Sequence, residues 1–315
     1  MPHLVHPHSS INSACFVPHT SFLLTGGGND FELKLHDLSP QSPTSTTFSK
    51  AHANSVNAVH TLPHTEVVVS ASNDTIVLHD LREQTVIRSL IATSIADVDG
   101  LSTPREQVLD CKMLNRDMVA SCGVNHHLNL YDLRQKSKRP VYNLSLGDDN
   151  LNSLDYNHAH TITVGSSNGS LYSLDVRKEC VVTDTFPHAS SIIHVACYGS
   201  ATRLVSSVDG HISLYDAQSE ALNVEISVPG DSTLRYKRNA QFVESHNVVL
   251  CGSEDGHIWI WDLVHGYAHR NRKRFVVDSP VAEGRLVTWT GFDSAANKLV
   301  GTTANGYLWV WDRAM

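Results

Sequence analysis

A pair of residues at a fixed separation recurs seven times in this chain of 315 residues and limits what it can fold into. Each pair is an Asp or Asn in a small-residue turn, followed seven residues later by an Asp. The turn residues are Asp30, Asn73, Asn125, Asn168, Asp209, Asp255 and Asn305, and the closing residues are Asp37, Asp80, Asp132, Asp175, Asp216, Asp262 and Asp312. Closing residues that follow one another at 43, 52, 43, 41, 46 and 50 residues indicate an array of equivalent units.

The residues around each turn predict strands. Asp and Asn support tight turns by bonding their own backbone, and Gly follows several of them, as in Asn168-Gly169. After the turn, residues alternate in the manner of a strand, so that Ile258 and Ile260 face one way. Short apolar segments such as 298–300 precede the turns, and helical periodicity of useful length is absent. We therefore predict an all-β fold with four antiparallel strands per unit.

The last unit lacks an outer strand of its own, because three residues follow Asp312. A spare segment, His3-Leu4-Val5, stands before the first inner strand. Open sheet edges invite aggregation, so we expect this N-terminal segment to supply the missing strand and close the ring of units.

The units resemble WD repeats, with the literal dipeptide at Trp261-Asp262 and Trp311-Asp312 and a substituted first residue elsewhere. The resemblance covers almost the whole chain and implies a single seven-bladed β-propeller over residues 1–315, with blades that end near the closing Asp residues. Strong WD repeats bury a hydrogen-bonded tetrad of Trp, Ser or Thr, His and Asp. Here no unit clearly has all four, so we expect the tetrads to be mostly incomplete.

Residues 204–266 carry a resemblance that is more specific than that of generic WD repeats. The string 204–210, Leu-Val-Ser-Ser-Val-Asp-Gly, is followed by Tyr236-Lys237, by 248–256 and by 261–266. With 165–169 and 174–177, they resemble the mitogen-activated protein kinase organizer family of small single-propeller scaffolds. That resemblance implies a scaffold or adaptor in a pre-mRNA splicing complex or a MAP-kinase signalling module, bound to other proteins of a multi-subunit complex.

Composition and motifs argue against catalysis, metal binding, direct nucleic-acid binding and a membrane-spanning segment. The net charge of −8 argues against direct nucleic-acid binding, and no apolar segment reaches membrane-spanning length. His3, His6 and His8, like His126-His127, lack Cys or carboxylate partners at metal-ligand spacing, and no phosphate loop or nucleophile motif occurs. We expect no enzyme, no cofactor and no metal, and a monomer in the cytoplasm, the nucleus or both.

Candidate partner-binding residues lie in long loops and in two basic runs, because loops on a rigid scaffold commonly carry function. The loop from about 91 to 107 contributes Asp97, Asp99 and Glu106, and the loop 229–238 contributes Arg235, Tyr236, Lys237 and Arg238. A third long loop runs from about 278 to 285. The basic runs, near the opposite side, are Arg134, Lys136, Lys138 and Arg139, and Arg270, Arg272, Lys273 and Arg274.

A second class of function stays open at this point. Substrate receptors of cullin–RING ubiquitin ligases often carry Trp-Asp-x-Arg at the end of a repeat. The nearest forms here lack the Trp and end in Arg82, Arg134 and Arg177. Loss of adaptor binding when these arginines are replaced would favour the receptor over the scaffold.

Overall fold

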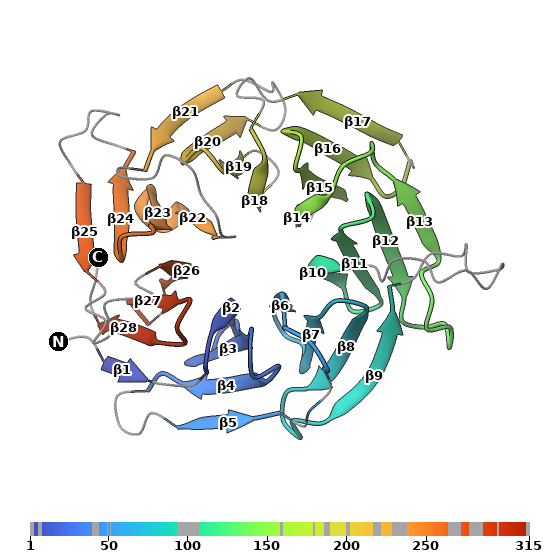
Figure 1. Cartoon of the computed structure of the whole chain (residues 1–315), viewed down its shortest axis with the longest axis horizontal. Coiled ribbons are helices and arrows are strands. Elements are labelled where there is room, and N and C mark those ends of the chain that lie inside the picture. Colours follow the sequence, from blue (N-terminus) through green and yellow to red (C-terminus); the bar gives the residue numbers. More distant parts are fainter. Residues whose placement is uncertain are drawn as a thin grey trace. The chain divides into compact units, whose positions relative to one another are not determined.

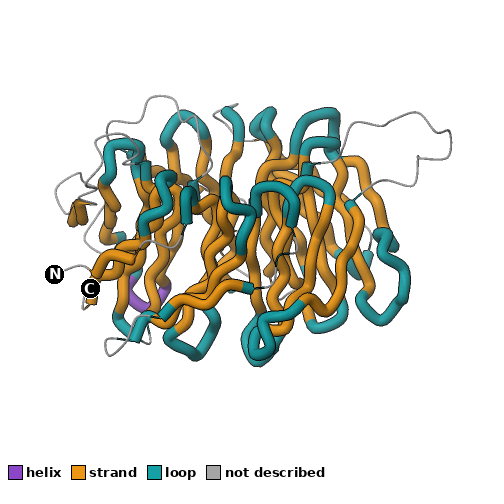
Figure 2. The backbone as a smooth tube through the Cα atoms, turned by 60° about the horizontal axis from the view of Figure 1, so that its bottom comes forward, coloured by secondary structure: helices purple, strands orange, loops and turns teal. Residues whose placement is uncertain are grey.

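The structure is a computed structural model. It describes residues 3–5, 8–39, 44–48, 50, 52–92, 107–157, 160–178, 180–185, 190–199, 202–216, 222–228, 238–263, 272–276, 286–294 and 296–312. Strands dominate this part of the chain, in which the helix present is the short 3-10 turn η2 (Glu244–His246), purple in Figure 2. The chain divides into two compact units, the first Asn12–Leu154 and the second Met1–Ile11 with Asp155–Met315. The single domain expected over 1–315 stays a prediction.

The first unit holds three four-stranded antiparallel sheets, apart from Ile11 at the start of β2 (Figure 1). In hydrogen-bonded order they are β2 (Ile11–Phe16), β3 (Phe22–Gly27), β4 (Leu33–Asp37) and β5 (Ser45–Thr47); β6 (Ala58–Thr61), β7 (Val67–Ala71), β8 (Thr75–Asp80) and β9 (Val86–Ile91); and β10 (Val108–Asn115), β11 (Met118–Gly123), β12 (His127–Asp132) and β13 (Tyr142–Ser145).

The other four sheets belong to the second unit, apart from the first residues of β14. Three are consecutive: β14 (Leu151–Asn157), β15 (Thr161–Ser166), β16 (Ser170–Asp175) and β17 (Cys180–Thr185); β18 (Ile192–Tyr198), β19 (Thr202–Ser207), β20 (His211–Asp216) and β21 (Leu222–Ser227); and β22 (Ala240–Val243), β23 (Val248–Gly252), β24 (His257–Asp262) and β25 (Arg272–Val276). The last sheet has β26 (Val287–Asp293), β27 (Lys298–Thr303), β28 (Leu308–Asp312) and β1 (His3–Val5).

Seven four-stranded antiparallel sheets make the predicted fold class, a seven-bladed β-propeller. The expected role of the N-terminal segment in the last sheet is also confirmed. Strand β1 pairs with β28 in the register His3 to Val310, Leu4 to Trp309 and Val5 to Leu308.

The hydrophobic core lies between successive sheets of each unit. In the first unit, one cluster joins the third blade to the second through side chains such as Met113, Tyr131 and Ile76. In the second unit, a comparable cluster includes Leu250, Ile258 and Val287. Alternation within each strand directs these apolar side chains toward the neighbouring sheet, where their burial drives folding.

Polar side chains on or beside the inner strands also tie neighbouring sheets together within each unit, a feature that the sequence analysis missed. A backbone N–H of one inner strand donates to a side chain of the preceding one, and each such bond contributes about 1 kcal/mol. In the first unit the bonds are Val59 N to Ser13 Oγ (3.2 Å), Met113 N to His60 Nδ1 (3.2 Å) and Leu154 N to Asp110 Oδ2 (3.1 Å). In the second unit they are Cys197 N to Asp155 Oδ2 (2.7 Å), Ala240 N to His194 Nδ1 (3.5 Å), Thr290 N to Asn239 Oδ1 (2.7 Å) and Phe292 N to Gln241 Oε1 (2.8 Å).

The second blade contains a buried hydrogen-bonded chain of side chains in which His79 stands where a WD repeat has Trp. His52 Nε2 lies 2.7 Å from Ser70 Oγ, which lies 2.8 Å from His79 Nε2. Thr75 Oγ1 lies 3.4 Å from His52 Nδ1. Phe48 packs edge-on against the His79 ring. The tetrad is therefore incomplete in composition but is hydrogen-bonded.

The blades that carry the literal Trp-Asp dipeptide differ from this one. In the sixth blade, Cys251 occupies the strand position of Ser70, and Trp261 Nε1 is buried without a hydrogen-bond partner among the described residues. In the seventh blade Gly301 occupies that position. In the first blade, by contrast, Thr25 Oγ1 lies 2.7 Å from His36 Nε2. The bonded pairs thus occur in the His-Asp blades.

Replacing Ser70 by Ala should lower the free energy of unfolding by about 2 kcal/mol, because it leaves two buried imidazole nitrogens without a partner. Ser121 offers a matched control at the equivalent position of β11. It is also fully buried, but its hydroxyl has no hydrogen-bond partner within the described structure. Chemical denaturation should show Ser121→Ala to be neutral or slightly stabilising. Equal losses in the two variants would contradict a bonding role for Ser70.

Candidate protein-interaction surface

Seven of the fifteen predicted partner-binding residues lie outside the described residues. These are Asp97, Asp99, Glu106, Arg235, Tyr236, Lys237 and Arg270. Strand β25 includes Arg272, Lys273 and Arg274, whose backbone pairs with β24 but whose side chains also lie outside the description.

Arg238, the last residue of the predicted loop 229–238, is an internal residue. Its side chain is only 1% exposed, and Nη1 donates to the backbone oxygen of Gly252 at 3.0 Å. Because its guanidinium bonds within the fold, Arg238 serves the packing of the sixth blade.

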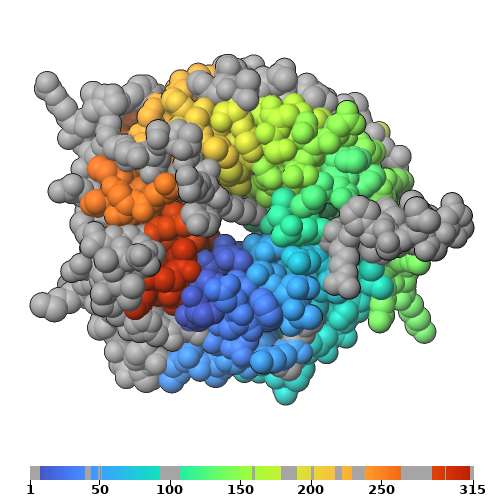
Figure 3. Space-filling view, in the orientation of Figure 1, coloured from blue at the N-terminus to red at the C-terminus, as the bar shows by residue number. Residues whose placement is uncertain are grey.

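The first basic run is fully described and forms a well-defined surface feature. It lies in residues 133–141, which connect β12 to β13 beside β9, green next to cyan at the lower right of Figures 1 and 3. Arg134, Lys136, Lys138 and Arg139 are all exposed. The structure therefore brings together all four predicted residues of this run. We call residues 134–139 the basic loop.

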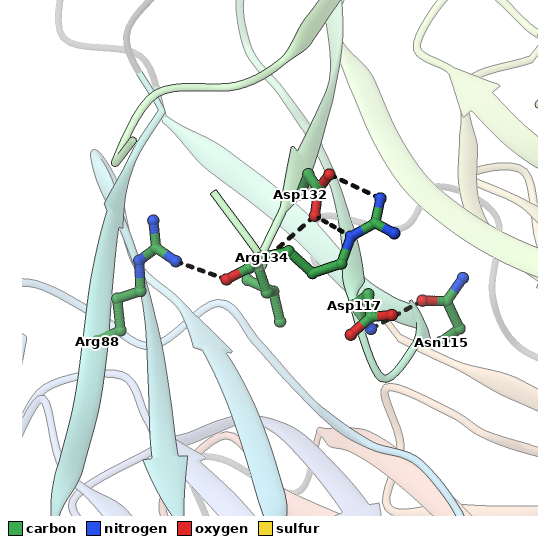
Figure 4. Close-up of polar contacts among 6 residues, drawn as sticks. Arg88, Asn115, Asp117, Asp132 and Arg134 are labelled. Carbon is green, nitrogen blue, oxygen red and sulfur yellow. Dashed lines mark hydrogen bonds and ion pairs between the residues drawn. The ribbon is translucent and has the colours of Figure 1, made fainter. Parts of the chain in front are cut away.

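Arg134 is held by the closing Asp of its blade (Figure 4). Nε donates to Oδ1 of Asp132 at 2.9 Å and Nη2 donates to Oδ2 at 2.8 Å, while the Arg134 backbone N–H also donates to Oδ1 at 3.0 Å. These hydrogen bonds from Arg134 lower the pKa of Asp132 to about 2. The same bonds raise the pKa of Arg134, to which nearby Asp117 also contributes. The charge of Arg134 is thus largely offset.

Arg88 of β9 fixes the backbone of this connection from the neighbouring blade, a role that the sequence analysis missed. Its Nη1 donates to the Leu133 oxygen at 2.9 Å, as Figure 4 shows, and its Nη2 donates to the Ser137 oxygen. The Ile91 N–H donates to the Lys138 oxygen at 2.8 Å. One arginine within the otherwise largely apolar segment 86–91 was the only available signal.

The other cations of the basic loop differ from Arg134, which is paired with Asp132. Among the described residues, Lys136, Lys138 and Arg139 make no side-chain ion pair. Elsewhere in the part of the chain that the structure describes, the geometry of Arg134 recurs at Arg177, which bonds both carboxylate oxygens of Asp175 at 3.2 and 3.0 Å. Arg82 instead pairs with Glu66.

Replacing Arg88 by Met should expose the basic loop to trypsin, because Met retains the apolar stem but loses both anchoring bonds. We expect cleavage after Lys136, Lys138 or Arg139 to be roughly tenfold faster than in the wild-type chain. Mass spectrometry of the fragments over time measures this rate. The control is Arg82→Met, which removes a surface ion pair without touching the loop. Equal cleavage rates in the wild-type chain and the Arg88 variant would exclude the anchoring role.

The described part of the chain offers neither a metal site nor a membrane-spanning helix. It contains no cluster of three or more His, Cys, Asp or Glu residues that could hold a metal ion. Within the same residues, no helix is long and apolar enough to cross a membrane.

Comparison with known proteins supports the WD-repeat β-propeller family. The model of the WD domain, G-beta repeat, matches residues 2–37, 42–80 and 238–262. An uncharacterized WD repeat-containing protein of Schizosaccharomyces pombe is 32% identical over 130 residues, which cover 41% of this chain and 42% of the relative. WD repeat domain-containing protein 83 of Rattus norvegicus is 31% identical over 136 residues, which cover 42% of this chain and 41% of the relative.

The chain thus spans about two fifths of the length of the curated relatives it matches. WD repeat proteins generally act as scaffolds that bind other proteins, and their fold is typically non-catalytic. Neither relative is named as an enzyme.

Proposed function

We propose that this protein is a non-catalytic scaffold that binds other proteins of a multi-subunit complex and is a monomer on its own. The observation that carries the proposal is the basic loop, whose exposed cations are displayed on a backbone fixed by Arg88 and Ile91. Rigid sheets that position a shaped, charged surface are suited to recognition of a partner.

The complex that we propose is a pre-mRNA splicing assembly or a MAP-kinase signalling module, in the nucleus, the cytoplasm or both. Support comes from the resemblance of residues 204–266 to the mitogen-activated protein kinase organizer family. Affinity purification of the tagged full chain from cells of its own organism tests the proposal. We expect spliceosomal or kinase-pathway proteins to be enriched, and recovery of neither group would contradict it.

A second candidate function is that of a substrate receptor of a cullin–RING ubiquitin ligase. It is favoured by Arg134 and Arg177, which are 69% and 57% exposed and are each held in the same way by a closing Asp. The test is an adaptor pulldown with Arg82, Arg134 and Arg177 replaced by Ala, with Lys178→Ala as the control. If the wild-type chain does not bind the adaptor, or if the triple variant binds it equally well, the receptor function is excluded.

A further inference from the structure

The basic loop opposes the charge of the whole chain. The net charge is −8, yet three exposed cations stand within residues 136–139. The carboxylates of Asp132 and Asp117 act on Arg134, so they leave Lys136, Lys138 and Arg139 as the unneutralised charge of the loop. A compact positive surface on an acidic protein attracts anionic partners selectively and speeds their association.

The loop is fixed before any partner arrives. Leu133 is held on both sides, because its N–H donates to the Asp117 oxygen at 2.7 Å and its own oxygen accepts from Arg88. The oxygens of Ser137 and Lys138 accept from Arg88 and Ile91. A segment whose backbone is already ordered loses less conformational entropy when it binds, which favours recognition over mere solvation of the charges.

Apolar side chains flank the cations. Ile91 is 36% exposed, and its backbone bond to Lys138 places it directly beside the loop. Ile87 on the same strand is 53% exposed, and Tyr142, which begins β13 where the loop ends, is 51% exposed. Partly exposed aliphatic and aromatic groups beside a charged rim are typical of protein recognition.

We infer that the basic loop and its apolar flank bind an acidic protein segment in which carboxylates accompany large apolar side chains. This inference rests on the proposed scaffold function and names the class of partner. Its carboxylates contact Lys136, Lys138 and Arg139, and its apolar side chains cover Ile91 and Tyr142. Single-stranded RNA fits less well, because stacking of successive bases requires several aromatic platforms and this surface offers Tyr142 alone among its described exposed residues.

A peptide selection tests the inference with the full chain. A random peptide library is selected against the wild-type chain and against the variant in which Lys136, Lys138 and Arg139 are all replaced by Ala. The matched control replaces Lys50, Arg82 and Lys178, which are also exposed, by Ala. Circular dichroism verifies that all three proteins are folded.

We expect peptides enriched by the wild-type chain and by the control to be rich in Asp and Glu together with Leu, Ile or aromatic residues. The best of them, labelled for fluorescence anisotropy, should bind the loop variant about tenfold more weakly than the control, and added salt should weaken the wild-type complex. No acidic bias in the selected peptides, or equal affinity for the two variants, overturns the inference. Tighter binding of oligouridylate than of the peptide by the same residues overturns it as well.

The two proposals fail in different ways. If affinity purification recovers a complex whose composition is unchanged by the loop variant, the scaffold stands and the acidic-segment site is wrong. If no partner is recovered with the wild-type chain or with either variant, the proposed scaffold function is wrong.

Discussion

Lowering the pH from 6.5 to about 4 is expected to destabilise the Asn12–Leu154 unit by at least about 3 kcal/mol, through His52 and His79. Burial lowers the pKa of His52 to about 4 from an ordinary value of 6.5, although the charge of Asp74 opposes the shift. Burial, together with the nearby His52, lowers the pKa of His79 to about 3. Both imidazoles therefore stay neutral in the native state while they take up protons in the unfolded state.

The sign follows from this difference in proton uptake. Well above pH 6.5 neither state binds these protons, so the contribution of the two histidines to stability is constant there. As the pH falls below 6.5, the two histidines bind protons in the unfolded state but not in the native state. Stability therefore decreases until the pH reaches the native pKa of each histidine. The geometry agrees, because His79 Nδ1 is buried without a hydrogen-bond partner among the described residues and could not satisfy a second N–H.

Urea denaturation at pH values between 7 and 4.5 measures this effect. The double variant His52→Gln, His79→Gln retains polar groups close to Ser70, but glutamine does not titrate. The stability of this variant should therefore depend much less on pH than that of the wild-type chain. Replacing the exposed His64 by Gln controls for the loss of a histidine as such. A wild-type slope in the double variant would show that the buried pair does not govern acid sensitivity.

Deletion of residues 1–6 should lower the melting temperature by about 5 °C, because it removes the whole of β1. Strand β28 would then lose the backbone pairing of residues 308–310 and present an unpaired edge. Such an edge also templates pairing with a second chain, so light scattering should rise earlier during heating.

Removal of residues 313–315 serves as the control for shortening the chain, since the described part of β28 ends at Asp312. Circular dichroism of the two deletions during heating separates the outcomes. If the melting temperature is unchanged without residues 1–6, the pairing of β1 with β28 does not contribute to stability.

Sequence periodicity was sufficient to predict the strands, because the signals are local. Each of the seven closing Asp residues ends the third strand of its sheet, from Asp37 at the end of β4 to Asp312 at the end of β28. At several of these sites, the hydrogen bonds of the Asp side chain explain why the strand ends there. Asp132 and Asp175, for example, accept a hydrogen bond from the backbone N–H two residues later, which turns the chain after the strand.

Contacts between distant residues could not be predicted in this way. The substituted repeats predicted mostly incomplete tetrads but did not indicate which blade is hydrogen-bonded, and Ser70 bonds His52 and His79 in a blade without Trp. Arg88 reaches a backbone oxygen 45 residues away, and no local pattern encodes that distance. The basic run was visible as a charge pattern, but its fixed backbone was not.

The central claim is that the chain acts by holding protein partners, and proximity labelling in cells tests it most directly. The full chain is fused to a labelling enzyme and compared with the enzyme alone and with the variant that lacks the charges of Lys136, Lys138 and Arg139. The scaffold predicts a reproducible set of labelled proteins around the wild-type chain, and the acidic-segment site predicts that some of them are lost from the variant. Labelling by the wild-type fusion no different from that of the enzyme alone would contradict the claim.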